Sequence, residues 1–143
     1  MTDRLIENDA NLADLLSGIP HGGVVALDTE AASFHRYHDR VYLVQLSAGE
    51  TTAVIDPLRV DLAPIGRLLA DGGVQKIFHD ADYDLRLLNF QYGFTARNLF
   101  DTRIAAQLAG EPGIGLAALL EKYFGVRPDK RFQRADWSER PLT

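Results

Sequence analysis

Short apolar segments alternate with polar turns along the chain, and their spacing predicts both strands and helices. Apolar stretches rich in β-branched residues predict strands at residues 24–27, 41–46, 52–55, 74–78 and 98–100. Apolar residues at helical spacing predict helices at residues 10–16, 62–70, 102–108 and 116–124, and a further helix from residue 80 to a stop at Gly93. The chain therefore mixes the two kinds of element throughout.

The order of these elements predicts an α/β fold with a mixed sheet. The connection Ala48-Gly49-Glu50 is short enough for a hairpin, which makes the strands on its two sides antiparallel neighbours. Strands that first run in a hairpin and then alternate with helices are typical of this class. A length of 143 residues favours a single domain around one hydrophobic core.

A pair of carboxylates follows the first predicted strand. Residues 24–27 are apolar on both faces, as in a buried central strand, and the polar sequence Asp28-Thr29-Glu30 comes directly after them. Alternate residues of a strand project from the same face, so Asp28 and Glu30 could share metal ions. For an isolated Asp-x-Glu, the more common explanation is a solvated loop.

A second acidic cluster follows the fourth predicted strand. Asp80 and Asp84 lie one helical turn apart, and Asp80 occupies the position of a helix N-cap. Asp84 lies deeper in the helix, where capping does not explain a carboxylate, so it is the better ligand candidate. The role of His79, at the end of the strand, stays open between packing, capping and catalysis.

Asp28, Glu30 and Asp84 would repel one another in the absence of a cation. Two divalent ions about 3.5–4 Å apart would offset that repulsion and support in-line hydrolysis of a phosphodiester. The chain contains no cysteine, so a metal site must use carboxylates and histidines. Oxygen ligands favour hard cations, and Mg²⁺ or Mn²⁺ is expected.

Several segments together resemble the ribonuclease D family, in that family's order and over nearly the whole chain. The matching segments are residues 25–30, 43–46, 54–58, 76–79 with 84–85, 100–102 and 135–142. The resemblance implies a ribonuclease H-like fold, with a mixed sheet of about five strands flanked by helices. It also implies a metal-dependent 3′–5′ exoribonuclease of the DEDD class, which releases nucleoside 5′-monophosphates from RNA or oligonucleotide 3′ ends.

The resemblance assigns roles to six residues of this chain. Asp28, Glu30 and Asp84 would be the catalytic metal ligands, and Thr29, Ala31 and His79 would lie near the 3′-terminal nucleotide. Asp56, Asp101 and Asp136 also match the family pattern, but they are not carried over as ligands. Asp101 directly precedes a predicted helix and is explained as its N-cap.

The chain departs from the family pattern at its end. In the family, a helix with a Tyr and, four residues later, a fourth metal-binding Asp follows the Arg-Pro-Leu segment, whereas this sequence stops at Thr143. We therefore expect a single exonuclease domain, residues 1–143, that lacks the helix with the third exonuclease motif. The alternative is a catalytically incomplete domain that binds nucleic acid or protein.

Charge and hydropathy limit the partners. A net charge of −5 argues against broad attachment to nucleic acid, although a site that holds a few terminal nucleotides does not need a basic surface. Single-stranded RNA or short oligonucleotide ends are expected as substrates, with DNA as a secondary one, and the oligomeric state stays open. No apolar run approaches the roughly 20 residues of a membrane span, and no signal peptide begins the chain, so a cytoplasmic location is expected.

The basic tail offers a further candidate contact with phosphates. Arg127, Lys130, Arg131, Arg134 and Arg140 make residues 127–140 the most basic stretch of the chain. A solvated face explains this charge equally well.

Overall fold

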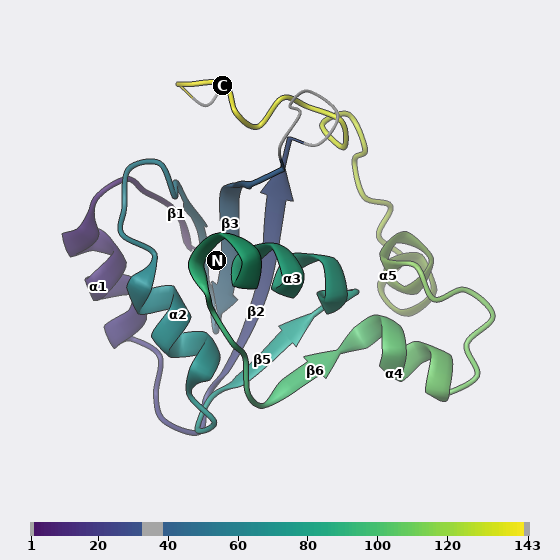
Figure 1. Ribbon diagram of the computed structural model, residues 1–143. Helices are drawn as coiled ribbons and strands as arrows, with labels where there is room; N and C mark the ends of the chain where they lie inside the picture. Colours follow the sequence, from purple (N-terminus) through teal and green to yellow (C-terminus); the bar gives the residue numbers. More distant parts are fainter. Residues whose placement is uncertain (1, 33–38, 142–143) are drawn as a thin grey trace.

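The computed structural model describes residues 2–32 and 39–141, and a six-stranded mixed sheet forms its centre (Figure 1). The strands lie in the order β1-β4-β3-β2-β5-β6. Their bounds are β1 (Thr2–Ile6), β2 (Val24–Ala31), β3 (Val41–Ala48), β4 (Thr51–Ile55), β5 (Gln75–Phe78) and β6 (Leu99–Asp101). The prediction of an α/β fold with a mixed sheet is confirmed, with one strand more than the five expected.

The additional strand is β1, at the edge of the sheet beside β4. It pairs parallel to β4, from Thr2 opposite Thr51 to Ile6 opposite Ile55. Ile6 is its single fully buried residue, and the rest of the strand is polar or exposed. Because an edge strand buries so little, its sequence lacks the apolar alternation by which strands are recognised.

The hairpin prediction is confirmed. β3 and β4 are antiparallel, with Val44 opposite Ile55 and Ala48 opposite Thr51. Gly49, in the turn between them, has a φ of +58°, a left-handed conformation that glycine adopts without a steric cost.

Five helices accompany the sheet in the described part of the chain. They are α1 (Asp9–Ser17), α2 (Ala63–Ala70), α3 (Ala81–Tyr92), α4 (Thr102–Leu108) and α5 (Leu116–Phe124). Leucines and isoleucines of α1, α2 and α3 form one hydrophobic core with the sheet, whereas α4 and α5 lie beyond β6 (Figure 1). None of the helices among the described residues has the length and apolar character needed to cross a membrane.

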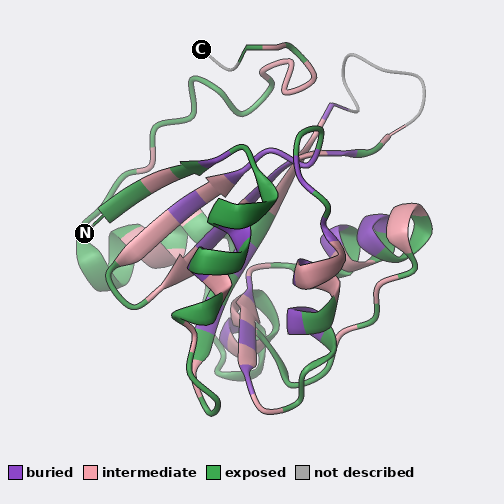
Figure 2. Ribbon diagram, turned by 90° about the vertical axis from the view of Figure 1, so that its left-hand side faces the viewer, coloured by how far each residue is buried: buried purple, intermediate pink, exposed green. Residues whose placement is uncertain are grey.

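β2 shows how the sheet presents two unlike faces. Val25 and Leu27 are 0% and 7% exposed and belong to the core with the helices, while the alternate residues Val24, Ala26 and Asp28 are exposed. Figure 2 colours the ribbon by burial and shows buried, intermediate and exposed residues in turn along the strands. This period-2 pattern places the carboxylates of β2 on the face opposite to the core helices. The buried strand predicted at residues 24–27 is thus buried on one face.

Three parallel strands end at one edge of the sheet. β5 runs parallel to both β2 and β6, with Ala26 opposite Ile77 and Phe78 opposite Asp101. In such sheets, the loops at the carboxyl ends of neighbouring parallel strands are close in space. The carboxyl ends of these strands therefore bring together the acids of β2, the residues that follow β5 and the residues that follow β6.

Asp101 connects the ends of β5 and β6, because its side chain caps the helices that follow them, α3 and α4. Its carboxylate accepts hydrogen bonds from the backbone N–H groups of Asp80 and Ala81, at the start of α3, and from those of Arg103 and Ile104, in the first turn of α4. Burial alone would raise its pKa, but these four hydrogen bonds to the carboxylate outweigh burial and lower it. The N-cap prediction for Asp101 is confirmed.

The capping prediction for Asp80 is wrong. Asp80 stands at the N-cap position of α3, yet its side chain makes no capping hydrogen bond. Its backbone is left-handed, with a φ of +64°, and its carboxylate lies 3.4 Å from the guanidinium of Arg103. Asp101 supplies the cap from another strand, a contact across 20 residues that no local pattern reveals.

Asp101→Ala is expected to destabilise the fold by about 2 kcal/mol, since one helix cap contributes about 1 kcal/mol and this residue serves two helices. Urea unfolding at pH 7 measures the loss. Asp61→Ala is the matched control, because the carboxylate of the exposed Asp61 accepts a single backbone hydrogen bond, from the N–H of Ala63. The lowered pKa means that Asp101 stabilises the fold above its ordinary pKa of 3.8 and loses this effect as the pH falls through the folded value. Equal losses in the two variants would contradict the double cap.

Candidate active site

Asp28 and Glu30 lie at the carboxyl end of β2, on the open face of the sheet. Asp28 is paired with Gln45 of β3 and Glu30 with Leu43, so the neighbouring strand holds both in register. The pairing shifts between Glu30 and Ala31, where β2 is irregular. Such an irregularity changes the direction of the side chains that follow it.

Asp84 reaches the same strand from α3. It is 6% exposed, and its carboxylate accepts a hydrogen bond from the hydroxyl of Thr29. Thr29 projects from the face of β2 on which α3 packs, so this bond holds Asp84 at the level of Asp28 and Glu30 along the strand, close enough for the charges of the three carboxylates to interact. The structure thereby brings together the first two acidic motifs that the sequence analysis singled out.

The electrostatics of the three carboxylates reflect burial and mutual repulsion. Burial raises the pKa of Glu30 to about 7, with further contributions from the charges of Asp28 and Asp84. Burial also raises the pKa of Asp84 to about 6; the hydrogen bond from Thr29 opposes this shift, and the charge of Asp28 adds to it. The pKa of Asp28 is raised as well, because surrounding protein atoms partly desolvate its carboxylate although the residue as a whole is exposed; a backbone hydrogen bond at Thr29 and the nearby His79 oppose that effect.

This donor set fits a divalent cation by its chemistry. All three side chains offer carboxylate oxygens, the ligands of hard cations, and a positive charge between them would offset the repulsion that raises their pKa values. In the part of the chain that the structure describes, no three such side chains are already gathered closely enough to form a complete metal site. The ligand roles of Asp28, Glu30 and Asp84 stay predictions.

The remaining predicted substrate residues surround the acid pair unequally. Thr29 contacts Asp84 through its side chain, and its substrate role is a prediction. His79 follows β5 and lies close enough to Asp28 to affect its pKa. Ala31 is partly buried and packs against the hydrophobic core, and its substrate role is likewise a prediction.

Two residues make contacts that the sequence analysis did not predict. Thr102 makes a 2.9 Å contact between its Oγ1 and Nδ1 of His79, although it was predicted only as the first residue of a helix. Arg140 binds the buried carboxylate of Asp56 through Nε and an Nη atom, at 2.9 Å each. Thr102 was predicted as a helix start and Arg140 as part of a basic tail, and both lie in segments that resemble the ribonuclease D family, but none of these signals indicates the contact partners.

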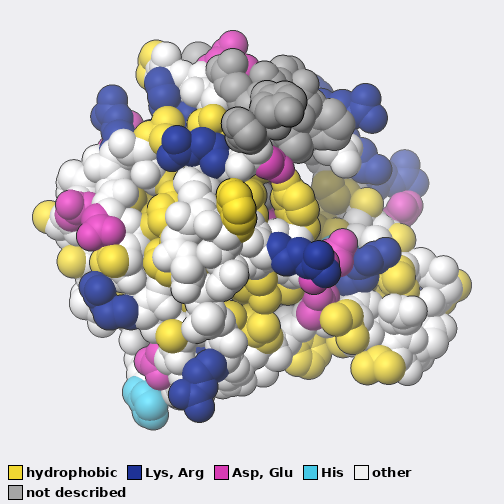
Figure 3. All heavy atoms as spheres, in the orientation of Figure 1, with side chains coloured by type: hydrophobic (Ala, Val, Ile, Leu, Met, Phe, Trp, Pro, Cys, Tyr) yellow, Lys and Arg dark blue, Asp and Glu magenta, His cyan; other side chains and the backbone are white. Residues whose placement is uncertain are grey.

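The basic tail is largely engaged within the chain. Arg140 is bound to Asp56, Arg127 is paired with Glu121, and Arg131 is paired with Asp129. On the face of the molecule shown in Figure 3, Lys and Arg side chains are dispersed and lie beside Asp and Glu. These observations favour the solvated face over a phosphate-binding stripe.

Glu30→Gln is expected to stabilise the metal-free chain at pH 8 by about 1–2 kcal/mol. The raised pKa of Glu30 makes ionisation less favourable in the native state, so stability falls as the pH rises from 4.5 to about 7. A glutamine does not ionise and escapes this loss. The expected gain is discounted for solvent screening, because Glu30 is partly exposed.

Urea unfolding of both forms in EDTA at pH 5 and pH 8 measures this effect. The exposed Glu50 supplies the matched control variant, Glu50→Gln. A gain for Glu30→Gln that is the same at pH 5 and pH 8 would refute the electrostatic origin.

Comparison with protein families gives one match across almost the whole chain. A family model described as 3′–5′ exonuclease matches residues 4–143. Ribonuclease D of Escherichia coli is 37% identical over 145 residues, and that of Granulibacter bethesdensis is 36% identical over 142 residues. The alignments include 100% and 97% of this chain but 39% and 36% of the relatives, so the chain spans about two fifths of their length.

Solved structures agree with the sequence matches. The crystal structure of Escherichia coli ribonuclease D, described as an exoribonuclease involved in structured RNA processing, has a TM-score of 0.90 at 36% identity and covers 100% of this chain and 39% of its own. The catalytic core of RRP6 from Trypanosoma brucei has a TM-score of 0.91 at 28% identity, over 99% and 40%.

A third neighbour is known with ligands. NrnC of Brucella melitensis has been solved with bound Mg²⁺, with a TM-score of 0.76 at 27% identity, and bound to pGG, with a TM-score of 0.77 at 28% identity. Each of these structures covers 100% of this chain and 70% of its own.

Proposed function

The chain belongs to the 3′–5′ exonuclease family, and on that premise we propose that it hydrolyses phosphodiester bonds at the 3′ end of RNA in a metal-dependent reaction. The observation that carries this proposal is the proximity of Asp28, Glu30 and Asp84 at the carboxyl end of β2, where burial, together with the charges of neighbouring carboxylates, raises the pKa values of Glu30 and Asp84. Carboxylates held together at such an electrostatic cost are typical of functional sites.

Asp28, Glu30 and Asp84 would hold two divalent ions, Mg²⁺ or Mn²⁺. When bound, the ions supply a positive charge that favours an attacking hydroxide and stabilises the departing 3′ oxygen. Glu30, whose pKa is raised to about 7, is the carboxylate best suited to exchange a proton with water near neutral pH. Thr29 keeps Asp84 in position through their hydrogen bond.

The substrate would be the 3′ end of single-stranded RNA or a short oligonucleotide, with DNA as a secondary substrate. The relatives called ribonuclease D and the neighbour bound to pGG support this choice. A net charge of −5 and a tail that is engaged in internal ion pairs also favour contact with a few terminal nucleotides over a long basic track. The corresponding location is the cytoplasm.

The test is incubation with RNA labelled at its 5′ end, in Mn²⁺ or in EDTA. Both the 143-residue chain and the complete product of its gene are assayed. We expect stepwise shortening from the 3′ end, with release of nucleoside 5′-monophosphates, in Mn²⁺ and no shortening in EDTA. Absence of metal-dependent cleavage by both forms would overturn the enzyme and leave a nucleic-acid or protein binding module.

Metal binding is measured separately from cleavage. Mn²⁺ is expected to raise the unfolding temperature of the wild-type chain more at pH 8 than at pH 5, because protons compete for the carboxylates of Asp84 and Glu30. A shift of the same size at both pH values, or in a Glu30→Gln variant, would contradict binding at this site.

A further inference from the structure

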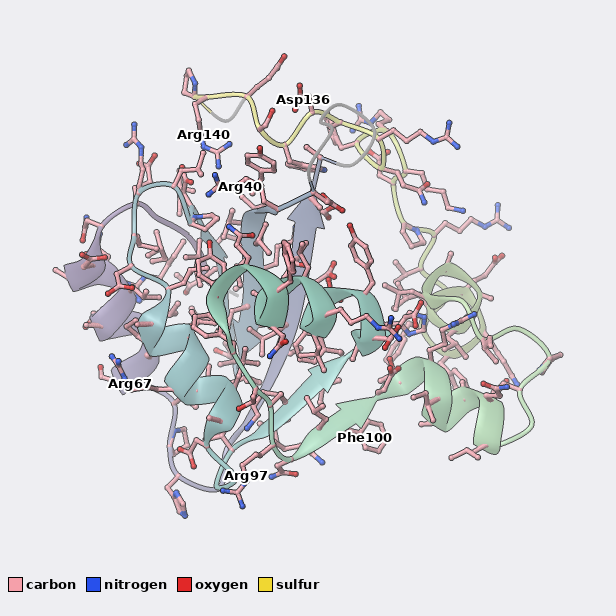
Figure 4. All side chains as sticks on the ribbon, viewed as in Figure 1. Arg40, Arg67, Arg97, Phe100, Asp136 and Arg140 are labelled. Atoms are coloured by element: carbon pink, nitrogen blue, oxygen red, sulfur yellow. The ribbon has the colours of Figure 1, made fainter. Side chains whose placement is uncertain are left out.

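The corner between β6 and α4 contacts the loop that follows β5. Thr102 is the first residue of α4, and its Oγ1 lies 3.1 Å from the carbonyl oxygen of Phe78 and 2.9 Å from Nδ1 of His79. Figure 4 labels Phe100 on β6, two residues before Thr102. One hydroxyl group thus bridges the end of β5 and the imidazole that follows it.

The donors and acceptors at this hydroxyl favour one tautomer of the histidine. A carbonyl oxygen only accepts hydrogen bonds, so Thr102 donates its single hydroxyl hydrogen to Phe78. The lone pairs of Oγ1 remain, and the contact with His79 requires the ring to donate through Nδ1–H. In the neutral imidazole, Nε2 is then left with a lone pair and no hydrogen.

The position of the imidazole ring determines which ligand Nε2 of His79 could contact. His79 follows β5 at the edge where the parallel strand β2 ends in Asp28 and Glu30. In the described part of the chain no hydrogen bond occupies Nε2 of His79. The free nitrogen is therefore available to a ligand at the carboxylate site, as an acceptor when the ring is neutral and as a donor when it is protonated.

We propose that Thr102 is a positioning residue of the active site, which holds the imidazole of His79 in the Nδ1–H tautomer and leaves Nε2 free for the 3′-terminal nucleotide. Asp101 supports the arrangement, because its four backbone hydrogen bonds fix the starts of α3 and α4 against each other. The contribution of Nε2 to substrate binding rests on the proposed function. The assignment of the tautomer is independent of the proposed function.

The tautomer is measured directly on the ¹⁵N-labelled chain. Long-range ¹H–¹⁵N spectra in mildly alkaline buffer distinguish a protonated from an unprotonated ring nitrogen. The chain has four histidines, and a His79→Gln variant assigns the signals of this one. The wild type is expected to be predominantly Nδ1–H, and an Nε2–H majority in the wild type would overturn the proposal without any need for a folded variant.

Variants at Thr102 then test the cause. Thr102→Val keeps the shape but removes the hydroxyl, and loss of one ordinary hydrogen bond should shift the tautomer ratio roughly fivefold toward Nε2–H. Thr102→Ser keeps the hydroxyl and should restore the wild-type ratio. Thr95→Val, at an exposed threonine, is the matched control and should leave the ratio unchanged. An unchanged ratio in a folded Thr102→Val variant would overturn the positioning role.

An activity measurement separates the inference from the proposed function. With RNA and Mn²⁺, Thr102→Val is expected to lose roughly fivefold in kcat/KM and Thr102→Ser to recover it. If the wild type cleaves RNA and Thr102→Val cleaves it equally well, the role of Thr102 in the reaction is overturned. If the wild type cleaves nothing, the proposed function fails, and the spectra still decide the tautomer.

Discussion

Asp28→Asn is expected to reduce metal-dependent shortening of RNA at least about 10³-fold, an effect of about 4 kcal/mol on the activation barrier. The substitution keeps the size of the side chain and removes its negative charge. The carboxylate of Asp28 lies near Glu30 and Asp84, and its negative charge contributes to their raised pKa values. If Asp28 is a metal ligand, as we propose, its loss removes one ligand from the proposed metal site.

The same substitution should also relieve repulsion in the metal-free chain. Asp28→Asn is therefore expected to bind Mn²⁺ more weakly without any loss of folding stability in EDTA, which distinguishes a ligand from a structural residue. Single-turnover cleavage of 5′-labelled RNA measures the first effect, and urea unfolding in EDTA measures the second.

Asp82→Asn is the matched control for this prediction. Asp82 lies in the first turn of α3, two residues before Asp84, but it is exposed and paired with Arg86 at 2.9 Å. An exposed i,i+4 pair contributes about 0.3–0.5 kcal/mol, so the control should retain its activity. Similar activity in the Asp28 and Asp82 variants would refute the assignment of Asp28 as a metal ligand.

Most of the fold could be predicted from the sequence, because its elements carry local patterns. β2 has a β-branched apolar run followed by an abrupt polar switch, and the β3–β4 turn has the short glycine-containing connection of a hairpin. β1 was missed because it is an edge strand whose residues are mostly polar or exposed. Its position is fixed by pairing with β4, which is distant in the sequence.

The same distinction applies to the candidate site. Asp28 and Glu30 could be selected from their spacing on one strand, and Asp84 from its position inside a helix, where capping fails to explain it. The contact between Thr29 and Asp84 spans 55 residues, and the one between Thr102 and His79 spans 23. Polar contacts of this range leave no periodic signal in the sequence, so they became visible only with the fold.

Capping shows how a correct motif can be assigned to the wrong residue. Asp80 occupies the N-cap position of α3, as its sequence context predicted, but its left-handed backbone and its contact with Arg103 leave capping to Asp101. Local propensity gave the place of the helix start. The tertiary contact between the ends of β5 and β6 decided which carboxylate serves it.

Arg140→Met is expected to destabilise the fold by about 3–5 kcal/mol, because it leaves the carboxylate of Asp56 buried without its counter-ion. Asp56 is 1% exposed and accepts hydrogen bonds from Nε and an Nη atom of Arg140. The guanidinium also donates to the backbone carbonyl groups of Tyr42, Trp137 and Glu139. Its planar fork thus fastens the tail to the ends of β3 and β4, and Figure 4 shows Arg140 between the tail and the sheet.

Arg140→Lys separates geometry from charge. A lysine ammonium keeps the positive charge but has three donors on one nitrogen, and it cannot reproduce the two-atom contact with Asp56 while also serving the carbonyl groups. We expect this variant to lose about half of what Arg140→Met loses. Arg131→Met, in an exposed pair with Asp129, is the matched control and should cost less than about 1 kcal/mol.

The pH dependence identifies the buried charge as the cause. Burial by itself would raise the pKa of Asp56, but the hydrogen bonds from Arg140 and the backbone N–H of Leu58, together with nearby positive charge, outweigh burial and lower it. In the wild type this contribution is present above the ordinary pKa of 3.8 and is lost as the pH falls through the folded value. In Arg140→Met the carboxylate lacks its main partner, so protonation relieves the penalty.

The difference in unfolding free energy between wild type and Arg140→Met should therefore shrink as the pH falls from 7 to 4, as urea unfolding at each pH would measure. Trypsin gives a local measurement, because the tail contains Arg127, Lys130, Arg131 and Arg134. Faster cleavage of the tail in Arg140→Met than in the wild type is expected if the guanidinium holds the tail on the sheet. A pH-independent loss of stability would instead identify packing of the arginine side chain as the origin, since packing does not change when Asp56 is protonated.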